Sequence, residues 1–106
     1  MANTYTNAKL DLTATSVTTL YTCAASTTAI VKSIVVSEDS GNADTITLTL
    51  TNGSDVYSLF KTKSVSANST VELLTAPLVV QATEILKVTA ATANRLHVVA
   101  SILEIT

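Results

Sequence analysis

The sequence predicts an all-β protein, an antiparallel β-sandwich of about eight strands with a jelly-roll-like order. Three observations predict this fold class. Residues Asp44 to Thr51 alternate strictly in the run Asp-Thr-Ile-Thr-Leu-Thr-Leu-Thr, which is the period of a half-buried strand. β-Branched residues dominate the other apolar segments, and polar connections separate these segments at short intervals. No segment has a convincing helical period.

The first part of the chain contains three extended segments. Ala8 to Leu12 is a short extended stretch, and residues 1 to 7 before it are expected to form an extended N-terminal arm. Val17 to Cys23 has irregularly spaced apolar residues, which indicates a bulge or an edge strand. Ala29 to Ser37 is almost continuously apolar and is therefore expected to be a central strand, with its one charge, Lys32, toward a rim.

The alternating strand should form a hairpin. Asn52-Gly53 follows Thr51 at once, and this pair readily accepts the two positive φ angles of a type I′ turn. We therefore expect Val56 to Lys61 to pair back on the alternating strand, within a second arm that begins at Ser54. The face of the first strand turned toward the core should carry Ile46, Leu48 and Leu50.

Four further segments complete the pattern. Thr70 to Leu74 is a short strand, and Ala76-Pro77 interrupts it because proline lacks a ladder donor. Leu78 to Gln81 resumes the extended run, and Glu84 to Thr89 alternates. The last predicted strand is Arg95 to Ile105.

Both faces of this last strand are rich in apolar residues. One face carries Leu96, Val98, Ala100 and Ile102, and the other carries His97, Val99, Ser101, Leu103 and Ile105. The second face is too apolar for free solvent, which favours a subunit contact over a kink between sheets. We predict an oligomer interface that contains Val99, Leu103 and Ile105.

Composition limits the classes of partner. The 106 residues fit a single domain spanning residues 1–106. Charged residues make up 13% of the chain, so threonine and serine must cover most of the surface, which favours contact with other protein. A net charge of −2 with scattered basic residues argues against nucleic acid. No apolar run approaches the ~20 residues of a membrane span, and no signal peptide is evident, so we expect synthesis in a cytoplasm and no membrane partner.

No pattern of residues indicates catalysis, a metal or another cofactor. The only carboxylate cluster, Glu38 to Asp44, lacks the spacing of a calcium loop and has the composition of a turn, so chelators should leave the protein's stability unchanged. The lone Cys23 is expected to be a buried apolar thiol, and the lone His97 is expected to pack in a strand. We therefore expect a protein that is not an enzyme.

A glycan-binding module is the functional alternative from another class. Sugar platforms usually need exposed aromatic rings, and this chain has Tyr5, Tyr21, Tyr57 and Phe60 but no tryptophan. Phe60 is better explained as core. The alternative depends mainly on Tyr57, which lies beside the predicted hairpin turn.

The order of the segments resembles that of small single-domain virion structural proteins of tailed bacteriophages. The resemblance is carried by the segments Leu20 to Ser37, Leu73 to Gln81 and Ile85 to Ile105. It implies a β-sandwich that forms a homo-oligomer, commonly a trimer, and that sits on the virion after synthesis in the host cytoplasm. Its implied partners are copies of itself and the major capsid protein or tail proteins. The expected role is capsid decoration, and the alternative is a tail, collar, baseplate or fibre component, with host-surface glycan binding as a further possibility.

Overall fold

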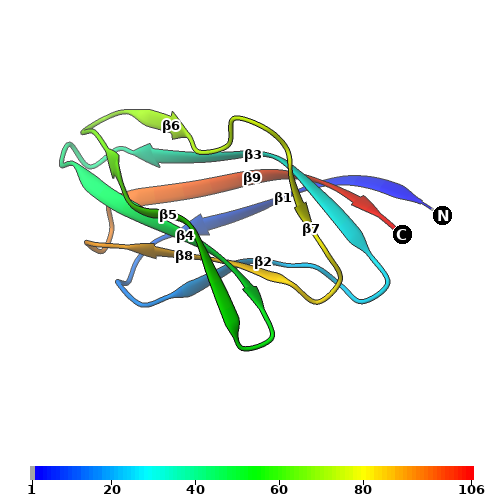
Figure 1. Ribbon diagram of the computed structural model, residues 1–106. Coiled ribbons are helices and arrows are strands. Elements are labelled where there is room, and N and C mark those ends of the chain that lie inside the picture. Colours follow the sequence, from blue (N-terminus) through cyan, green and yellow to red (C-terminus); the bar gives the residue numbers. More distant parts are fainter. Residues whose placement is uncertain (1) are drawn as a thin grey trace.

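The computed structural model describes residues 2–106 and consists of strands joined by turns and loops (Figure 1). Its nine strands are β1 (Asn3–Asp11), β2 (Thr18–Thr22), β3 (Thr28–Glu38), β4 (Asp44–Asn52), β5 (Asp55–Val65), β6 (Thr70–Glu72), β7 (Leu78–Val80), β8 (Ile85–Ala90) and β9 (Leu96–Ile105). No helix long and apolar enough to cross a membrane occurs in residues 2–106.

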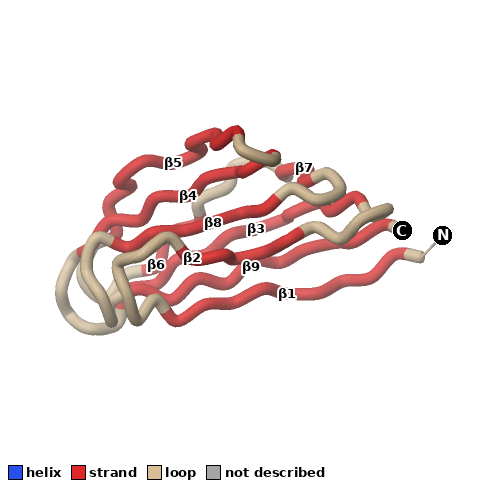
Figure 2. The backbone as a smooth tube through the Cα atoms, turned by 90° about the horizontal axis from the view of Figure 1, so that it is seen from below, coloured by secondary structure: helices blue, strands red, loops and turns tan. Residues whose placement is uncertain are grey.

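The strands form two sheets that pack face to face (Figure 2). Sheet A has the order β1-β9-β3-β6, with β7 also paired to β3, and sheet B has the order β2-β8-β4-β5. Every pair is antiparallel. Apart from the β4–β5 hairpin and the β6–β7 link, consecutive strands lie in opposite sheets as in a jelly roll, so the predicted antiparallel sandwich is confirmed.

The predicted break at Pro77 explains why nine strands fill eight positions. β6 pairs with β3 from Val35 to Ser37, and β7 pairs with the other end of β3 from Ala29 to Val31. The two short strands therefore share one place at the edge of sheet A. Proline removes one ladder donor and favours an irregular link between them.

The core lies between the inner faces of the two sheets. Its fully buried side chains include Ile34 and Val36 of β3, Ile46 and Leu48 of β4, and Val98 of β9. On β9 the expected inner face is confirmed, because Leu96, Val98, Ala100 and Ile102 are all buried. These side chains alternate with outward ones, as the pleat requires.

The N-terminus differs from the expected arm. β1 begins at Asn3 and pairs with β9 in one unbroken register, from Asn3 opposite Ile105 to Asp11 opposite His97. Residues 3 to 7 are therefore part of sheet A, while Met1 lies outside the described residues. The sequence underestimates β1 because its exposed half carries few apolar side chains, whereas backbone pairing with β9 holds it in place.

The β4–β5 hairpin forms, but its turn is not the predicted type I′ turn. Asn52 still belongs to β4 and pairs with Asp55, so Gly53 and Ser54 are the two loop residues. Of these three residues Gly53 alone has a positive φ, of 62°. Glycine at the first central position is the requirement of a type II′ turn, which also matches the twist of the strands. The prediction placed the turn one residue too early.

Strand β4 keeps the expected alternation except at its end. Ile46 and Leu48 are fully buried, whereas Leu50 is half-buried and Thr51 is buried. Thr51 lies between Ile85 of β8 and Val56 of β5. Its hydroxyl has no hydrogen-bond partner among the described residues.

Strand β5 is longer than predicted because two irregularities interrupt its ladder without ending it. One register shift lies opposite Thr47, where Thr62 has a φ of 50° and its N–H donates to the Thr47 hydroxyl at 3.1 Å. Pairing then resumes, and Val65 is fully buried. The predicted irregularity in the second strand is also present, as a register shift between Thr19 and Tyr21.

Candidate functional site

The outer face of sheet A is the main candidate for a binding surface. The three interface residues predicted from the sequence, Val99, Leu103 and Ile105, all lie on β9 and point away from the core. Val99 is 42% exposed, and the other two are half-buried. The structure therefore brings the three onto one face.

Pairing extends this apolar character across the sheet. Leu103 lies opposite Tyr5 of β1 on one side and Ile30 of β3 on the other. Ile30 in turn lies opposite Val79 of β7. Side chains directly opposite in an antiparallel pair share a face and touch. The row is partly open to solvent, since Tyr5 is 75% and Val79 is 50% exposed.

A second row runs beside the first, where Val99 lies between Lys9 of β1 and Val35 of β3. We call the two rows, together with the end of β9, the outer apolar patch. Its members are Tyr5, Ile30, Val35, Val79, Val99, Leu103 and Ile105. Because the inner residues of the same strands fill the core, this patch is not needed to hold the sandwich together. It is surface that remains available to another molecule.

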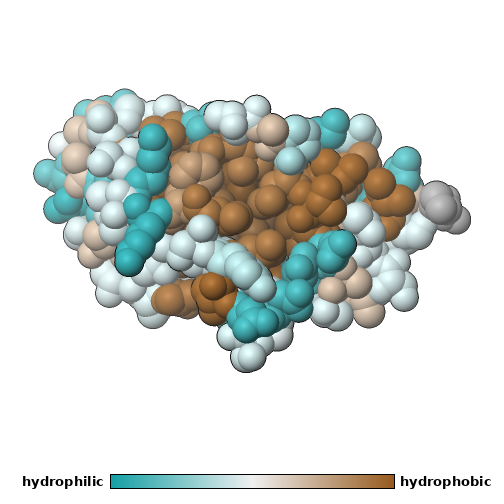
Figure 3. Space-filling model, viewed as in Figure 1, coloured by the Kyte–Doolittle hydropathy of each residue, from teal (hydrophilic) through white to brown (hydrophobic). Residues whose placement is uncertain are grey.

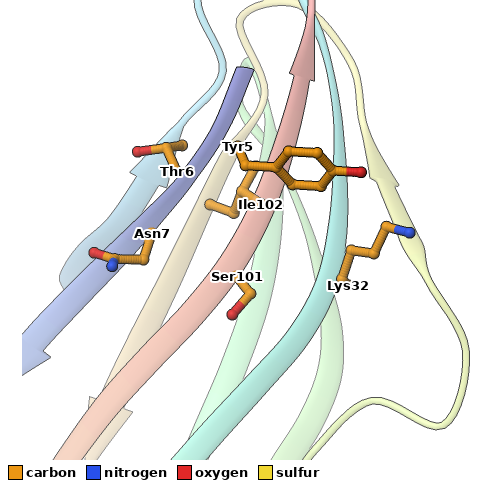
Figure 4. A pocket seen from close by; sticks show the side chains of 6 residues that line it. All are labelled: Tyr5, Thr6, Asn7, Lys32, Ser101 and Ile102. Carbon is orange, nitrogen blue, oxygen red and sulfur yellow. The ribbon is translucent and has the colours of Figure 1, made fainter. Parts of the chain in front are cut away.

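A shallow pocket of about 450 Å³ lies at the centre of this face. In Figure 4 the Tyr5 ring reaches from β1 across β9 toward β3, the strand that carries Lys32. Asn7 and Ser101 also line the pocket. Lys32 is exposed at a register shift in β3, so it lies over the sheet and not at the rim that the sequence suggested. The pocket thus combines an aromatic ring with amide, hydroxyl and ammonium groups.

A second apolar surface lies at the edge of the sandwich where β5 faces β7 (Figure 3). It is a groove of about 340 Å³ lined by apolar residues of β5, of the link between β6 and β7 and of the start of β7, including Leu59, Phe60, Leu73, Leu74 and Leu78. Phe60 is partly buried and packs against the core, as the sequence predicted. The groove exists because β6 and β7 are too short to cover the edge completely.

The ionisable side chains mainly secure loops. Glu38 is buried, and its carboxylate accepts hydrogen bonds from the N–H groups of Ser40 at 2.7 Å, Gly41 at 3.1 Å and Asn68 at 3.0 Å, as well as from the Ser40 hydroxyl. Desolvation raises the pKa of Glu38, but the hydrogen bonds outweigh it and hold this pKa at about 2. Glu38 therefore joins the β3–β4 and β5–β6 loops.

Tyr21 and Cys23 are held by similar contacts at the other end of the sandwich. The Tyr21 hydroxyl donates to Glu104 at 2.5 Å, which links β2 of sheet B to β9 of sheet A. Burial, together with the Glu104 carboxylate, raises the pKa of Tyr21. Cys23 is buried, as predicted, and burial raises the pKa of its thiol. Tyr21 is therefore committed to an internal contact and does not offer a free aromatic face.

His97 does not pack as the sequence suggested. It lies on the outer face of sheet A, with Nε2 at 3.3 Å from Asp11 and Nδ1 at 3.7 Å from Asp39. The side chain is 42% exposed, at the second residue of β9. Within residues 2–106, no group of three or more His, Cys, Asp or Glu side chains is placed to hold a metal ion.

Sequence reasoning missed the role of Glu38, although a signal was present. The inward positions of β3 continue from Ile34 and Val36 to Glu38 by the period of two, so Glu38 falls on the buried face. A buried carboxylate beside a Ser-Gly-Asn loop should accept backbone N–H groups. The sequence gives no sign of the pocket at Tyr5 either, because residues 1 to 7 are expected from it to form an arm.

Comparison with known proteins provides no family for this chain. No protein-family model matches it, and no curated protein matches it significantly. Among solved structures, it is similar to a chain described as "Structure of infectious bursal disease virus Gt strain", with a TM-score of 0.49 and 11% sequence identity. The similar region covers 98% of this chain and 30% of that chain. A likeness this low carries no argument about fold or function.

Proposed function

We propose that this chain is a non-enzymatic structural subunit of a bacteriophage virion that self-associates and binds neighbouring particle proteins. The observation that carries the proposal is the outer apolar patch of sheet A. A small jelly roll that leaves Tyr5, Val79 and Val99 exposed on one sheet has more apolar surface than its own core requires. The sequence resemblance to virion structural proteins supports the same role.

The proposed mechanism is stabilisation by buried area. A homotrimer contact across the outer apolar patch would place Val99, Leu103 and Ile105 against a neighbouring copy. A permanent interface of this kind buries on the order of 1,000 Å² or more, with an apolar centre and a polar rim. In the favoured arrangement the oligomer sits on the major capsid protein as a decoration subunit, because a compact domain suits a cap over a lattice axis.

Location on the particle tests this proposal. We expect an image reconstruction of the intact virion to show density for this sandwich on the head, in contact with the capsid protein. Density on the tail, collar or baseplate would instead exclude capsid decoration and support the alternative role as a tail, collar, baseplate or fibre component. Absence of the chain from purified particles, measured by mass spectrometry, would contradict a virion role altogether.

A second candidate function is binding of a host-surface glycan, and the Tyr5 pocket favours it. Tyr5 offers an exposed ring for the apolar face of a sugar, while Asn7, Ser101 and Lys32 offer polar groups beside it. Tyr57, the residue favoured from sequence, is 54% exposed on β5 and is absent from the lining of this pocket. Binding to a glycan array that is lost in Tyr5→Ala but kept in Tyr57→Ala would support this function.

A further inference from the structure

The free edge of β1 carries a regular row of backbone groups that point away from the sheet. Ala2 and Thr106 exchange both backbone hydrogen bonds, at 3.3 and 2.9 Å, and the Leu12 N–H donates to the Leu96 carbonyl at 3.0 Å. Bonded and non-bonded pairs alternate along an antiparallel ladder, and the register between these two points is unbroken. The residues whose N–H and C=O groups face the free edge are therefore Asn3, Tyr5, Asn7, Lys9 and Asp11.

The other three edges of the sandwich are protected against strand addition. β2 has five residues and a register shift, while β6 and β7 have three residues each. β5 is long, but two register shifts, a positive φ at Thr62 and the lysines Lys61 and Lys63 interrupt its edge. Short strands, bulges and lysines are the usual means of blocking edge pairing.

β1 is neither short nor bulged, and Lys9 is its only lysine. It has nine residues, contains no proline and pairs with β9 without a register shift. Figure 2 shows β1 as the outermost strand of its sheet. In the part of the chain that the structure describes, β9 is its only strand partner. A long, regular and exposed edge is a template for another strand.

We propose that β1 pairs with β1 of a second copy, antiparallel and across a two-fold axis at Asn7, to join two A sheets into one. This inference deepens the self-association in the proposed function and rests on it. The contact is separate from the proposed trimer contact across the outer apolar patch. It joins one oligomer to the next.

The side chains of β1 are self-complementary in this register. Tyr5 lies opposite Lys9 of the partner copy, and Asn3 lies opposite Asp11 of the partner copy. The two charges of β1, on Lys9 and Asp11, therefore meet no like charge, which would oppose pairing. All five edge-facing residues are paired in this register. The Lys9 ammonium lies beside the Tyr5 ring of the partner copy, and an aromatic ring attracts a cation. Lys9 therefore does not block this edge as a lysine usually does.

Site-specific cross-linking tests the pairing. In the full chain, Asn7→Cys places two thiols opposite each other at the axis, with Cβ atoms about 5 Å apart. A short bismaleimide should then convert the variant into a covalent dimer. Asn3→Cys is the matched control on the same strand and face, because its two copies lie about 27 Å apart in this register. The native Cys23 is buried and should not react.

Two separate proline variants provide a second test. Asn7→Pro removes an N–H that faces the free edge, so the monomer should keep its melting temperature while the two-fold contact is lost. Ala8→Pro removes an N–H that bonds β9, so it should lower the melting temperature.

Equal cross-linking of Asn3→Cys and Asn7→Cys would overturn the inference, as would no cross-linking of Asn7→Cys in a protein that light scattering shows to be oligomeric. The second result would leave the proposed function standing. A wild-type chain that stays monomeric would remove both the β1 pairing and the self-association on which it rests.

Discussion

The two sheets share one core but differ in their outer faces. The outer side of sheet A carries Leu103, Ile30 and Val99 in paired rows, whereas the corresponding side of sheet B carries Thr47 opposite Thr89 and Thr49 opposite Lys87. A hydroxyl-rich face is well hydrated, and an apolar face is not. Under the proposed function, sheet B would be the solvent side of the subunit and sheet A the side that meets other protein.

The inner faces should be equally sensitive to truncation because they form a single core. Leu48→Ala in sheet B and Ile34→Ala in sheet A each remove a fully buried side chain, and each should cost about 2–5 kcal/mol of unfolding free energy. Urea denaturation measures both. If either variant loses less unfolding free energy than a surface substitution does, the two sheets do not share the core described here.

The turn between β4 and β5 should tolerate changes unequally at its two neighbouring positions. Gly53→Val puts a β-branched side chain at a φ of 62° and should cost about 1–3 kcal/mol, although no atom lies close enough to clash. Asn52→Val is the matched control, because Asn52 is an ordinary strand residue here. Equal melting temperatures for both variants would contradict the turn geometry.

The outer faces should respond differently to a new charge. Leu103→Asp on sheet A should weaken self-association by tenfold or more, which corresponds to about 1.4 kcal/mol, because a carboxylate would be buried in the contact. Thr49→Asp on sheet B should leave self-association unchanged. Sedimentation velocity measures both variants. An equal effect of the two substitutions would remove the distinction between the faces.

The smallest of these effects concerns the pH dependence that Glu38 gives to the loops. Its folded-state pKa of about 2 lies below the value of about 4.3 for an unfolded chain, so its stabilising contribution is present above that value. The contribution is lost as the pH falls toward the folded pKa. Glu38→Gln should therefore lower the melting temperature at neutral pH and reduce its decline between about pH 4 and 2. Asp55→Asn, at an exposed carboxylate near the hairpin turn, is the control.

The sequence predicts the parts of this fold that depend on side-chain period. The alternation around Ile46 and Leu48, the two-sided β9 and the break at Pro77 were all readable because each depends on which side chains face the core. The extent of β1 and the type of the Gly53 turn were not readable, because backbone pairing determines both. A one-residue change in loop position leaves composition unchanged but changes which residue needs a positive φ.

The sequence predicts the candidate site only in part. The outward direction of Val99 and Leu103 follows from the period of β9, but their neighbours Tyr5, Ile30 and Val79 come from three other strands. Strand order in a sandwich depends on contacts between residues distant in sequence, and a single amino-acid sequence does not reveal these contacts. The outer apolar patch therefore became visible only with the register.

The solution mass of the unmodified chain tests the central claim most directly. Light scattering coupled to gel filtration, at micromolar concentrations and neutral pH, should give a mass several times the 11.0 kDa of one chain. In the Leu103→Asp variant, this solution mass should fall on dilution. A mass of one chain at every concentration, for a protein with the wild-type melting transition, would contradict the claim that sheet A exists to meet other copies.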